Sequence, residues 1–309
     1  MSNNPHIPVV KLRAELLIDT RSTLGEGIIW NHITKKLLWV DIDEGLLHTY
    51  DPALECLSTT AFKQKVSMVA IANHDHLILA FQDGLYSYEI STGGLQALAD
   101  NPENQTTNNR FNDGKCDAMG RLWLGTMGHK QSAALYCVDH EHQIQTMLTG
   151  ITTSNGIAWS PDQQDMYYID SDTSKVVAYA FETRTGLISD PRDVISIPEV
   201  MGIPDGSAID AEGMLWIALW GGYCVTRWNP VNGALLATVA VPSKNVTSCT
   251  FGGEQLDQLY ITTARTQTSA EELNLNPYSG GIFVLNPGVK GKQTNLFQSN
   301  YKLNKHNEI

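Results

Sequence analysis

The 309-residue sequence is poor in cysteine and in basic residues, and it has no long apolar segment. Its five cysteines are an odd number without C-x-x-C spacing, so we expect no disulfide framework. With 21 Lys and Arg against 33 Asp and Glu, the formal net charge is −12, which argues against nucleic acid or an anionic membrane as a partner. Neither a transmembrane segment nor a signal peptide is visible. We therefore expect a cytoplasmic protein.

The sequence also lacks convincing helical periodicity. Apolar residues alternate, or cluster in short runs bounded by Gly, Pro, Asn and Asp, which is typical of β-strands. One such run recurs six times, beginning at Leu37, Leu77, Leu122, Met166, Leu215 and Leu259. The intervals of 40 to 49 residues match four short strands with their turns, the length of one β-propeller blade. Six of the tryptophans recur at strand positions and are predicted to pack between blades.

The stretch 14–19 (AELLID) has the pattern of a further strand without a blade of its own. We expect it to pair with the last blade and close the ring, because closure removes two open sheet edges. The predicted fold is an all-β, six-bladed β-propeller with four-stranded blades, forming a single domain over residues 1–309. About 12 residues at the N-terminus and about 10 at the C-terminus are expected to be peripheral.

A polar residue lies ten or eleven positions before each recurring run. These residues are Glu26, Ser67, Asn112, Asn155, Asp205 and Ser248. In a propeller this position begins the innermost strand of each blade, so we expect the six side chains to meet at the central channel. Turn chemistry explains one Asn-Gly or Asp-Gly pair but does not select a polar residue in all six repeats. Carboxylate and amide oxygens suit Ca²⁺, Mg²⁺ or Mn²⁺, or Zn²⁺ or Fe²⁺ with water completing the shell.

Several stretches around these positions occur in a characteristic order. They are GEGIIW from Gly25, RFNDGKCDAMGRLWLGTM from Arg110, SNGIAWSPDQQDMYYIDS from Ser154, GIPDGSAIDAEGMLWIA from Gly202 and TSCTFGGEQLDQLYITTAR from Thr247. Together they resemble the SMP-30/gluconolactonase/regucalcin family of sugar lactonases, from about Leu16 to about Gly291. The resemblance implies a six-bladed propeller and divalent-metal-dependent hydrolysis of an aldonolactone, such as a glucono-, galactono-, xylono- or arabinono-lactone.

The resemblance also implies roles for individual residues. The implied metal ligands are Glu26, Asn155 and Asp205, and the implied substrate-binding pair is Arg110 and Asn112. Asp205 is in addition the implied general base, and its role as ligand only or as ligand and base stays open. After GTM the sequence continues GHKQSAALY, where the family often carries an acidic substrate contact. Lys130 lies near that place and is a candidate substrate-binding residue.

Two other functions fit the same pattern. The first is a calcium-binding regulatory propeller without strong catalysis, and the second is a propeller esterase acting on other esters. The polar channel argues against an apolar ester, and no G-x-S-x-G motif is present. The polar loop 100–110 is expected to form a rim over the channel, with Asn108 and Asn109 toward the substrate. The expected partner is a small-molecule sugar lactone, bound by a monomer or weak homodimer.

Overall fold

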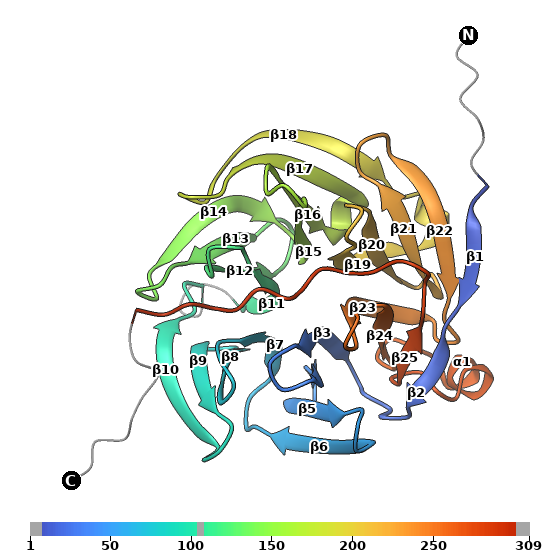
Figure 1. Cartoon of the computed structure of the whole chain (residues 1–309), viewed down its shortest axis with the longest axis horizontal. Helices are drawn as coiled ribbons and strands as arrows, with labels where there is room; N and C mark the ends of the chain where they lie inside the picture. The colour runs from blue at the N-terminus through green and yellow to red at the C-terminus, as the bar shows by residue number, and fades with distance from the viewer. Residues whose placement is uncertain (1–7, 104–107, 301–309) are drawn as a thin grey trace.

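The structure is a computed structural model that describes residues 8–103 and 108–300. Six sheets are arranged in a ring around a common axis, and within each sheet the strands that follow residue 24 run outward from that axis in sequence order (Figure 1). The first blade contains β3 (Gly25–Asn31), β4 (Lys36–Asp41), β5 (Leu46–Asp51) and β6 (Cys56–Ala61). The second contains β7 (Val66–Ile71), β8 (His76–Phe81), β9 (Gly84–Glu89) and β10 (Gly94–Asp100). The predicted six-bladed propeller is confirmed.

The remaining blades repeat this plan. The third contains β11 (Arg110–Cys116), β12 (Leu122–Met127), β13 (Ala133–Val138) and β14 (Ile144–Ile151). The fourth contains β15 (Ser154–Trp159), β16 (Asp165–Asp170), β17 (Lys175–Glu182) and β18 (Leu187–Ser196). The fifth contains β19 (Ile203–Ile209), β20 (Leu215–Trp220), β21 (Cys224–Asn229) and β22 (Ala234–Ala240). The sixth contains β23 (Asn245–Gly252), β24 (Gln258–Ala264) and β25 (Ile282–Leu285).

The N-terminal residues complete two blades. β2 (Glu15–Ile18) pairs antiparallel with β25, so that Glu15 lies opposite Val284, and it supplies the fourth strand of the sixth blade. The predicted ring closure is thereby confirmed. β1 (Val10–Arg13) pairs parallel with β22 and adds a fifth, outermost strand to the fifth blade, which the sequence did not predict.

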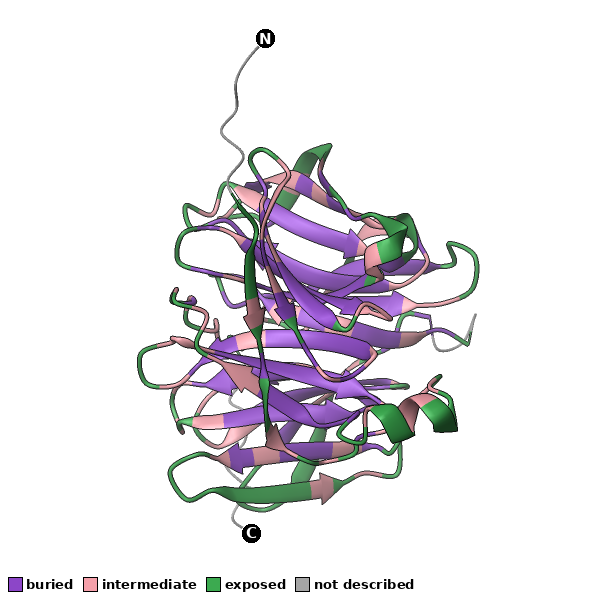
Figure 2. Cartoon of the chain, turned by 90° about the vertical axis from the view of Figure 1, so that its right-hand side faces the viewer, coloured by how far each residue is buried: buried purple, intermediate pink, exposed green. Residues whose placement is uncertain are grey.

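The core lies between the blades. Inner strands such as β7 are buried along their whole length, whereas the outer strand β6 is almost entirely exposed (Figure 2). Trp39, Trp123 and Trp216 are fully buried, and the other tryptophans predicted to lie between blades are buried as well. Burial of such large apolar side chains supplies much of the free energy that holds neighbouring blades together.

Each innermost strand carries a β-bulge at or beside the predicted channel residue. The shifts in register fall between Glu26 and Ile29, Val66 and Met68, Phe111 and Gly114, Asn155 and Ile157, Pro204 and Ser207, and Val246 and Ser248. A bulge inserts an extra residue and changes the direction of the adjacent side chains. In the sixth blade the extra residue is Thr247, one position before the predicted Ser248. The bulges explain why this position of every repeat differs from an ordinary buried strand.

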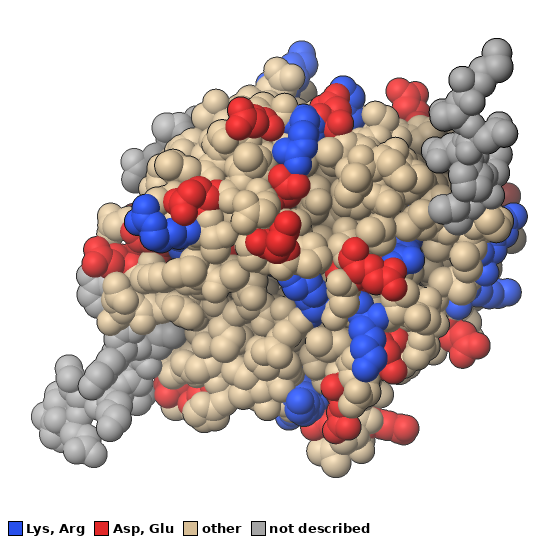
Figure 3. Space-filling model, turned by 45° about the horizontal axis from the view of Figure 1, so that its top comes forward, with Lys and Arg blue, Asp and Glu red and all other residues tan. Residues whose placement is uncertain are grey.

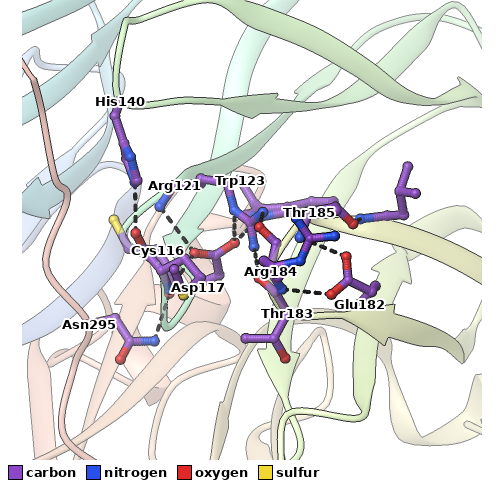
Figure 4. Close-up of polar contacts among 12 residues, drawn as sticks. Cys116, Asp117, Arg121, Trp123, His140, Glu182, Thr183, Arg184, Thr185 and Asn295 are labelled. Atoms are coloured by element: carbon purple, nitrogen blue, oxygen red, sulfur yellow. Dashed lines mark hydrogen bonds and ion pairs between the residues drawn. The ribbon is translucent and has the colours of Figure 1, made fainter.

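A buried carboxylate organises the turn between β11 and β12 (Figure 4). Asp117 Oδ2 accepts hydrogen bonds from Nε of Arg121 at 2.6 Å and from Nε1 of Trp123 at 2.9 Å. The guanidinium also donates to the carbonyl of Thr183 in the fourth blade at 2.7 Å. Asp210 makes the same contacts to a Trp and an Arg in the fifth blade. These carboxylates are therefore structural, and they tie a turn to its own or the adjacent blade.

Residues 288–300, which we name the strap, follow β25 and cross the face of the ring on which the inner strands end (Figure 1). The backbone N–H of Phe297 donates to Ile71 in the second blade at 2.7 Å, and Asn295 Nδ2 donates to Cys116 in the third at 3.1 Å. The Phe297 ring is buried and stacks with His142, with centroids 5.9 Å apart. His142 itself is half-buried against the strap. The strap covers one end of the channel.

Helical structure is confined to short segments in the described part of the chain. These are η1 (Ser171–Thr173), η2 (Glu199–Met201) and α1 (Ala270–Leu275), the last capped by the Ser269 side chain. No helix among the described residues has the length and apolar character needed to cross a membrane. All five cysteines are free, as the sequence predicted. On the face seen in Figure 3, acidic and basic side chains are interspersed.

Candidate functional site

The open end of the channel holds a cavity of about 420 Å³ where the inner strands begin. Its lining includes four of the six predicted channel residues, from four different blades: Glu26, Asn112, Asn155 and Asp205. Arg110, the first residue of β11, lies beside them, and Met127 and Trp220 contribute apolar wall. Ser67 and Ser248 are buried but do not line this cavity. The cavity is therefore polar at its base and partly apolar at its sides.

Two carboxyl groups face each other at the base of the cavity. The side chains of Glu26 and Asp205 are within hydrogen-bonding reach, and each is less than a tenth exposed. Burial is the main cause that raises the pKa of Glu26 to about 8, followed by the negative charge of Asp113. Burial and then the charge of Glu26 raise the pKa of Asp205 well above its ordinary value. Such a pair needs either a shared proton or a cation between its oxygens.

The amide side chains are held by hydrogen bonds that run across three blades. Arg110 Nη1 donates to Asn112 Oδ1 at 2.8 Å, and Asn112 Nδ2 donates to Asn155 Oδ1 at 3.0 Å. Asn155 Nδ2 in turn donates to Ser171 Oγ at 2.8 Å, and that hydroxyl donates to Pro204 O at 2.6 Å. This chain turns the Asn155 carbonyl oxygen toward Asn112 and leaves its second lone pair available. Ser171, which links this series of hydrogen bonds to the backbone at Pro204, was not among the residues predicted from the sequence.

Two further charged groups of β11 lie below the site. Asp113 follows Asn112 in the bulge, and Lys115 Nζ donates to Ser207 O at 2.7 Å. Burial raises the pKa of Asp113 and lowers that of Lys115, and each charge favours the ionised form of the other. The negative charge of Asp113 also contributes to the raised pKa values of Glu26 and Asp205. The motif RFNDGK contained both residues, but only the bulge reveals that they point into the channel.

Donor chemistry decides which ions the residues can hold. The site offers two carboxylates and amide oxygens, and the described residues contain no cluster of three or more His, Cys, Asp or Glu side chains able to hold a metal ion. An all-oxygen set with few charges fits Ca²⁺, Mg²⁺ or Mn²⁺ better than an ion that prefers nitrogen or sulfur. The residues that would hold it are the predicted Glu26, Asn155 and Asp205.

Two predicted elements of the rim lie away from the base of the cavity. Lys130 is exposed, with a positive φ of 48°, and it is not among the residues that line the cavity. Of the predicted rim loop, residues 104–107 lie outside the described residues. Asn109 is buried and donates to Glu103 Oε2 at 2.7 Å and to Ser132 O at 3.0 Å. It therefore anchors the loop to the third blade.

Comparison with known proteins agrees with this geometry. The model of the family described as SMP-30/Gluconolactonase/LRE-like region matches residues 24–265. The chain is 38% identical to the Bacillus subtilis protein YvrE, which carries the name of a sugar lactone lactonase, over 87% of this chain and 93% of that protein. It is 34% identical to human regucalcin, over 91% and 96% of the two chains.

A solved structure gives the same result. The calcium-binding protein regucalcin of Agrobacterium tumefaciens superimposes with a TM-score of 0.89 at 30% identity, covering 94% of this chain and 99% of that one. The family match covers all six channel positions and most of the propeller. The chain belongs to the SMP-30/gluconolactonase/LRE-like family.

Proposed function

We propose that this protein hydrolyses sugar lactones with the help of one divalent cation held by Glu26, Asn155 and Asp205. The observation that carries the proposal is the pair of buried carboxyl groups beside Arg110 in a cavity of about 420 Å³. The names of two relatives, a sugar lactone lactonase and a regucalcin, support lactone hydrolysis and a cation respectively. A cavity of this size exceeds what an ion needs and has room for a sugar ring.

Different residues of the cavity are assigned to bind the cation and the lactone. A bound cation would polarise the lactone carbonyl and lower the pKa of a water molecule. Arg110 is positioned to donate hydrogen bonds to the hydroxyl groups or ring oxygen of the lactone, because its hydrogen bonds to Phe111 and Asn112 involve only Nη1. Asn112 orients both Arg110 and Asn155. Met127 and Trp220 shield one side of the cavity from water.

Hydrolysis itself needs one proton acceptor. The oxygen of a water molecule bonds to the lactone carbonyl carbon, and the ring C–O bond breaks to give the open-chain acid. We assign Asp205 to accept the proton of the attacking water and to return it to the departing ring oxygen. Ser171 Oγ fixes the backbone next to Asp205 through its bond to Pro204 O, and so acts as a positioning residue.

A pH-indicator assay on glucono-, galactono-, xylono- and arabinono-lactones, with and without a chelator, tests the proposal. We expect turnover that a chelator abolishes and that Ca²⁺, Mg²⁺ or Mn²⁺ restores. Asp205→Asn should lower kcat by about 100-fold or more. Asp190→Asn, an exposed change at positive φ that Asn tolerates, is the matched control. Cation binding without turnover of any lactone would instead favour a calcium-binding protein. Turnover that a chelator does not reduce would refute the role of the cation in hydrolysis.

A further inference from the structure

A second cavity opens beside the candidate site, between the second and third blades. We name it the side pocket, and its lining includes Lys65, Gln82, Asn108, Arg110, Met127 and His129. Its volume is about 640 Å³. It shares Lys65, Arg110 and Met127 with the candidate site, so the two cavities adjoin at these three residues. A group that extends from a lactone ring in the candidate site past these residues would enter the side pocket.

The two cavities differ in charge. The candidate site is lined by four acidic residues: Glu26, Asp43, Asp172 and Asp205. The side pocket has Lys65, Arg110 and His129 in its wall, and no Asp or Glu of the described chain lines it. Gln82 and Asn108 add neutral hydrogen-bonding groups. A part of the substrate that extends from the lactone ring into the side pocket thus meets donors and positive charge rather than carboxylates.

The two cations at the junction retain donors for a ligand. Lys65 Nζ lies 2.6 Å from Asp43 Oδ1, and its side chain is 47% exposed. An ammonium group has three donors, so two stay available toward the side pocket. Arg110 forms no ion pair with any described residue, and its hydrogen bonds within that part of the chain use Nη1 only. Charge-assisted bonds from such groups to carboxylate or phosphate oxygens are among the stronger hydrogen bonds in proteins.

We propose that the preferred substrates are sugar lactones with an anionic group, a carboxylate or a phosphate, on the carbon chain outside the lactone ring. Lys65 and His129 bind this group in the side pocket, while the ring lies over Glu26 and Asp205. The proposal rests on the proposed lactonase function, because it concerns the substrate of the same site. It adds two specificity-determining residues that the sequence motifs do not contain.

Paired substrates test the proposal. D-glucono-1,5-lactone is compared with its 6-phosphate, and D-glucono-1,4-lactone with D-glucaro-1,4-lactone, so that the pairs separate phosphate from carboxylate. We expect kcat/KM to be about tenfold higher for at least one anionic member, mainly through a lower KM. Lys65→Met should remove that advantage, so that the anionic and neutral members of each pair are hydrolysed with similar kcat/KM. Lys63→Met, an exposed lysine nearby that does not line the side pocket, should change neither.

Binding of open-chain acids provides a readout that does not need turnover. Calorimetry should show tighter binding of D-glucarate or 6-phosphogluconate than of D-gluconate, and Lys65→Met should abolish the difference. Equal kcat/KM within both pairs, or equal loss on anionic and neutral substrates in Lys65→Met, would overturn this proposal alone. If no lactone is hydrolysed but the Lys65-dependent preference in binding persists, the proposed function fails and the anion site stands. If the preference is absent from binding and kinetics, the anion site fails.

Discussion

Cation binding at the paired carboxyl groups should be coupled to the release of a proton. Burial and neighbouring carboxylates hold the pKa of Glu26 at about 8, so below that pH the cation-free pair retains a proton. A cation can share the two carboxylates only after displacing this proton. Well below pH 8 each pH unit should then weaken the apparent affinity about tenfold, and for one displaced proton the Kd for Ca²⁺ should be about fiftyfold larger at pH 6 than at pH 8.

Titration calorimetry at both pH values, in two buffers that differ in ionisation enthalpy, counts the protons released. We expect close to one proton per cation at pH 6 and fewer as the pH rises past 8. Glu26→Gln removes one of the two groups that can hold a proton, so it should bind Ca²⁺ more weakly and with a smaller dependence on pH, the remainder coming from the buried Asp205. Asp190→Asn should behave like the unaltered protein. A Kd that is equal at pH 6 and pH 8, without proton release, would refute the assignment of both carboxylates to one ion.

Four further outcomes are expected. Asp117→Ala should lower the free energy of unfolding in urea by about 3–5 kcal/mol, because it leaves the buried Arg121 guanidinium without its carboxylate partner, and a loss below about 1 kcal/mol would contradict this. Burial lowers the pKa of His48 from 6.5 to about 4, so the folded state binds fewer protons than the unfolded state, and stability should fall by up to about 3 kcal/mol as the pH drops from 6.5 to 4; His48→Gln should flatten this dependence. Phe297→Ala should lower the free energy of unfolding by about 3–5 kcal/mol yet leave lactone turnover measurable, since Phe297 belongs to the strap at the far end of the channel; complete loss of activity in folded protein would argue against that separation. Arg110→Met should lower kcat/KM about tenfold or more on every lactone while the Kd for Ca²⁺ changes less than about twofold, and a parallel loss of Ca²⁺ binding would make Arg110 part of the cation site.

The propeller could be predicted because each blade is one continuous segment of the sequence. The strand that closes the ring could be predicted because residues 14–19 have a clear strand pattern. The stretch 14–19 alternates as a strand, and β2 within it pairs with β25 as expected. β1 was not predicted, because its four residues gain their partner only through a parallel pairing with β22, more than two hundred residues away. The strap was missed for a similar reason: its polar residues have no period, and its fixed position comes from separate hydrogen bonds to several blades.

Some residues of the candidate site could likewise be predicted from the sequence, and others could not. Glu26 and Asp205 were found because their position repeats, and the structure brings them into one cavity. Lys115 was missed because the direction of a side chain next to a bulge cannot be predicted from the alternation of a regular strand. Lys65 was missed because it lies in a loop, which approaches the site only once the ring of blades has formed. Lys130 was chosen for its place in the loop after GTM; its side chain is exposed and does not line the cavity, and its contact with substrate stays a prediction.

The closed base of the cavity has a consequence for kinetics. Because the candidate site opens at one end only, arrival and departure share a single opening, so the hydrolysed acid must diffuse away before another lactone can reach the carboxylates. The acid is then expected to act as a competitive inhibitor, raising the apparent KM without changing the maximal velocity. Shortening the strap should leave this product inhibition unchanged, because the cavity under the strap and the candidate site share no lining residue.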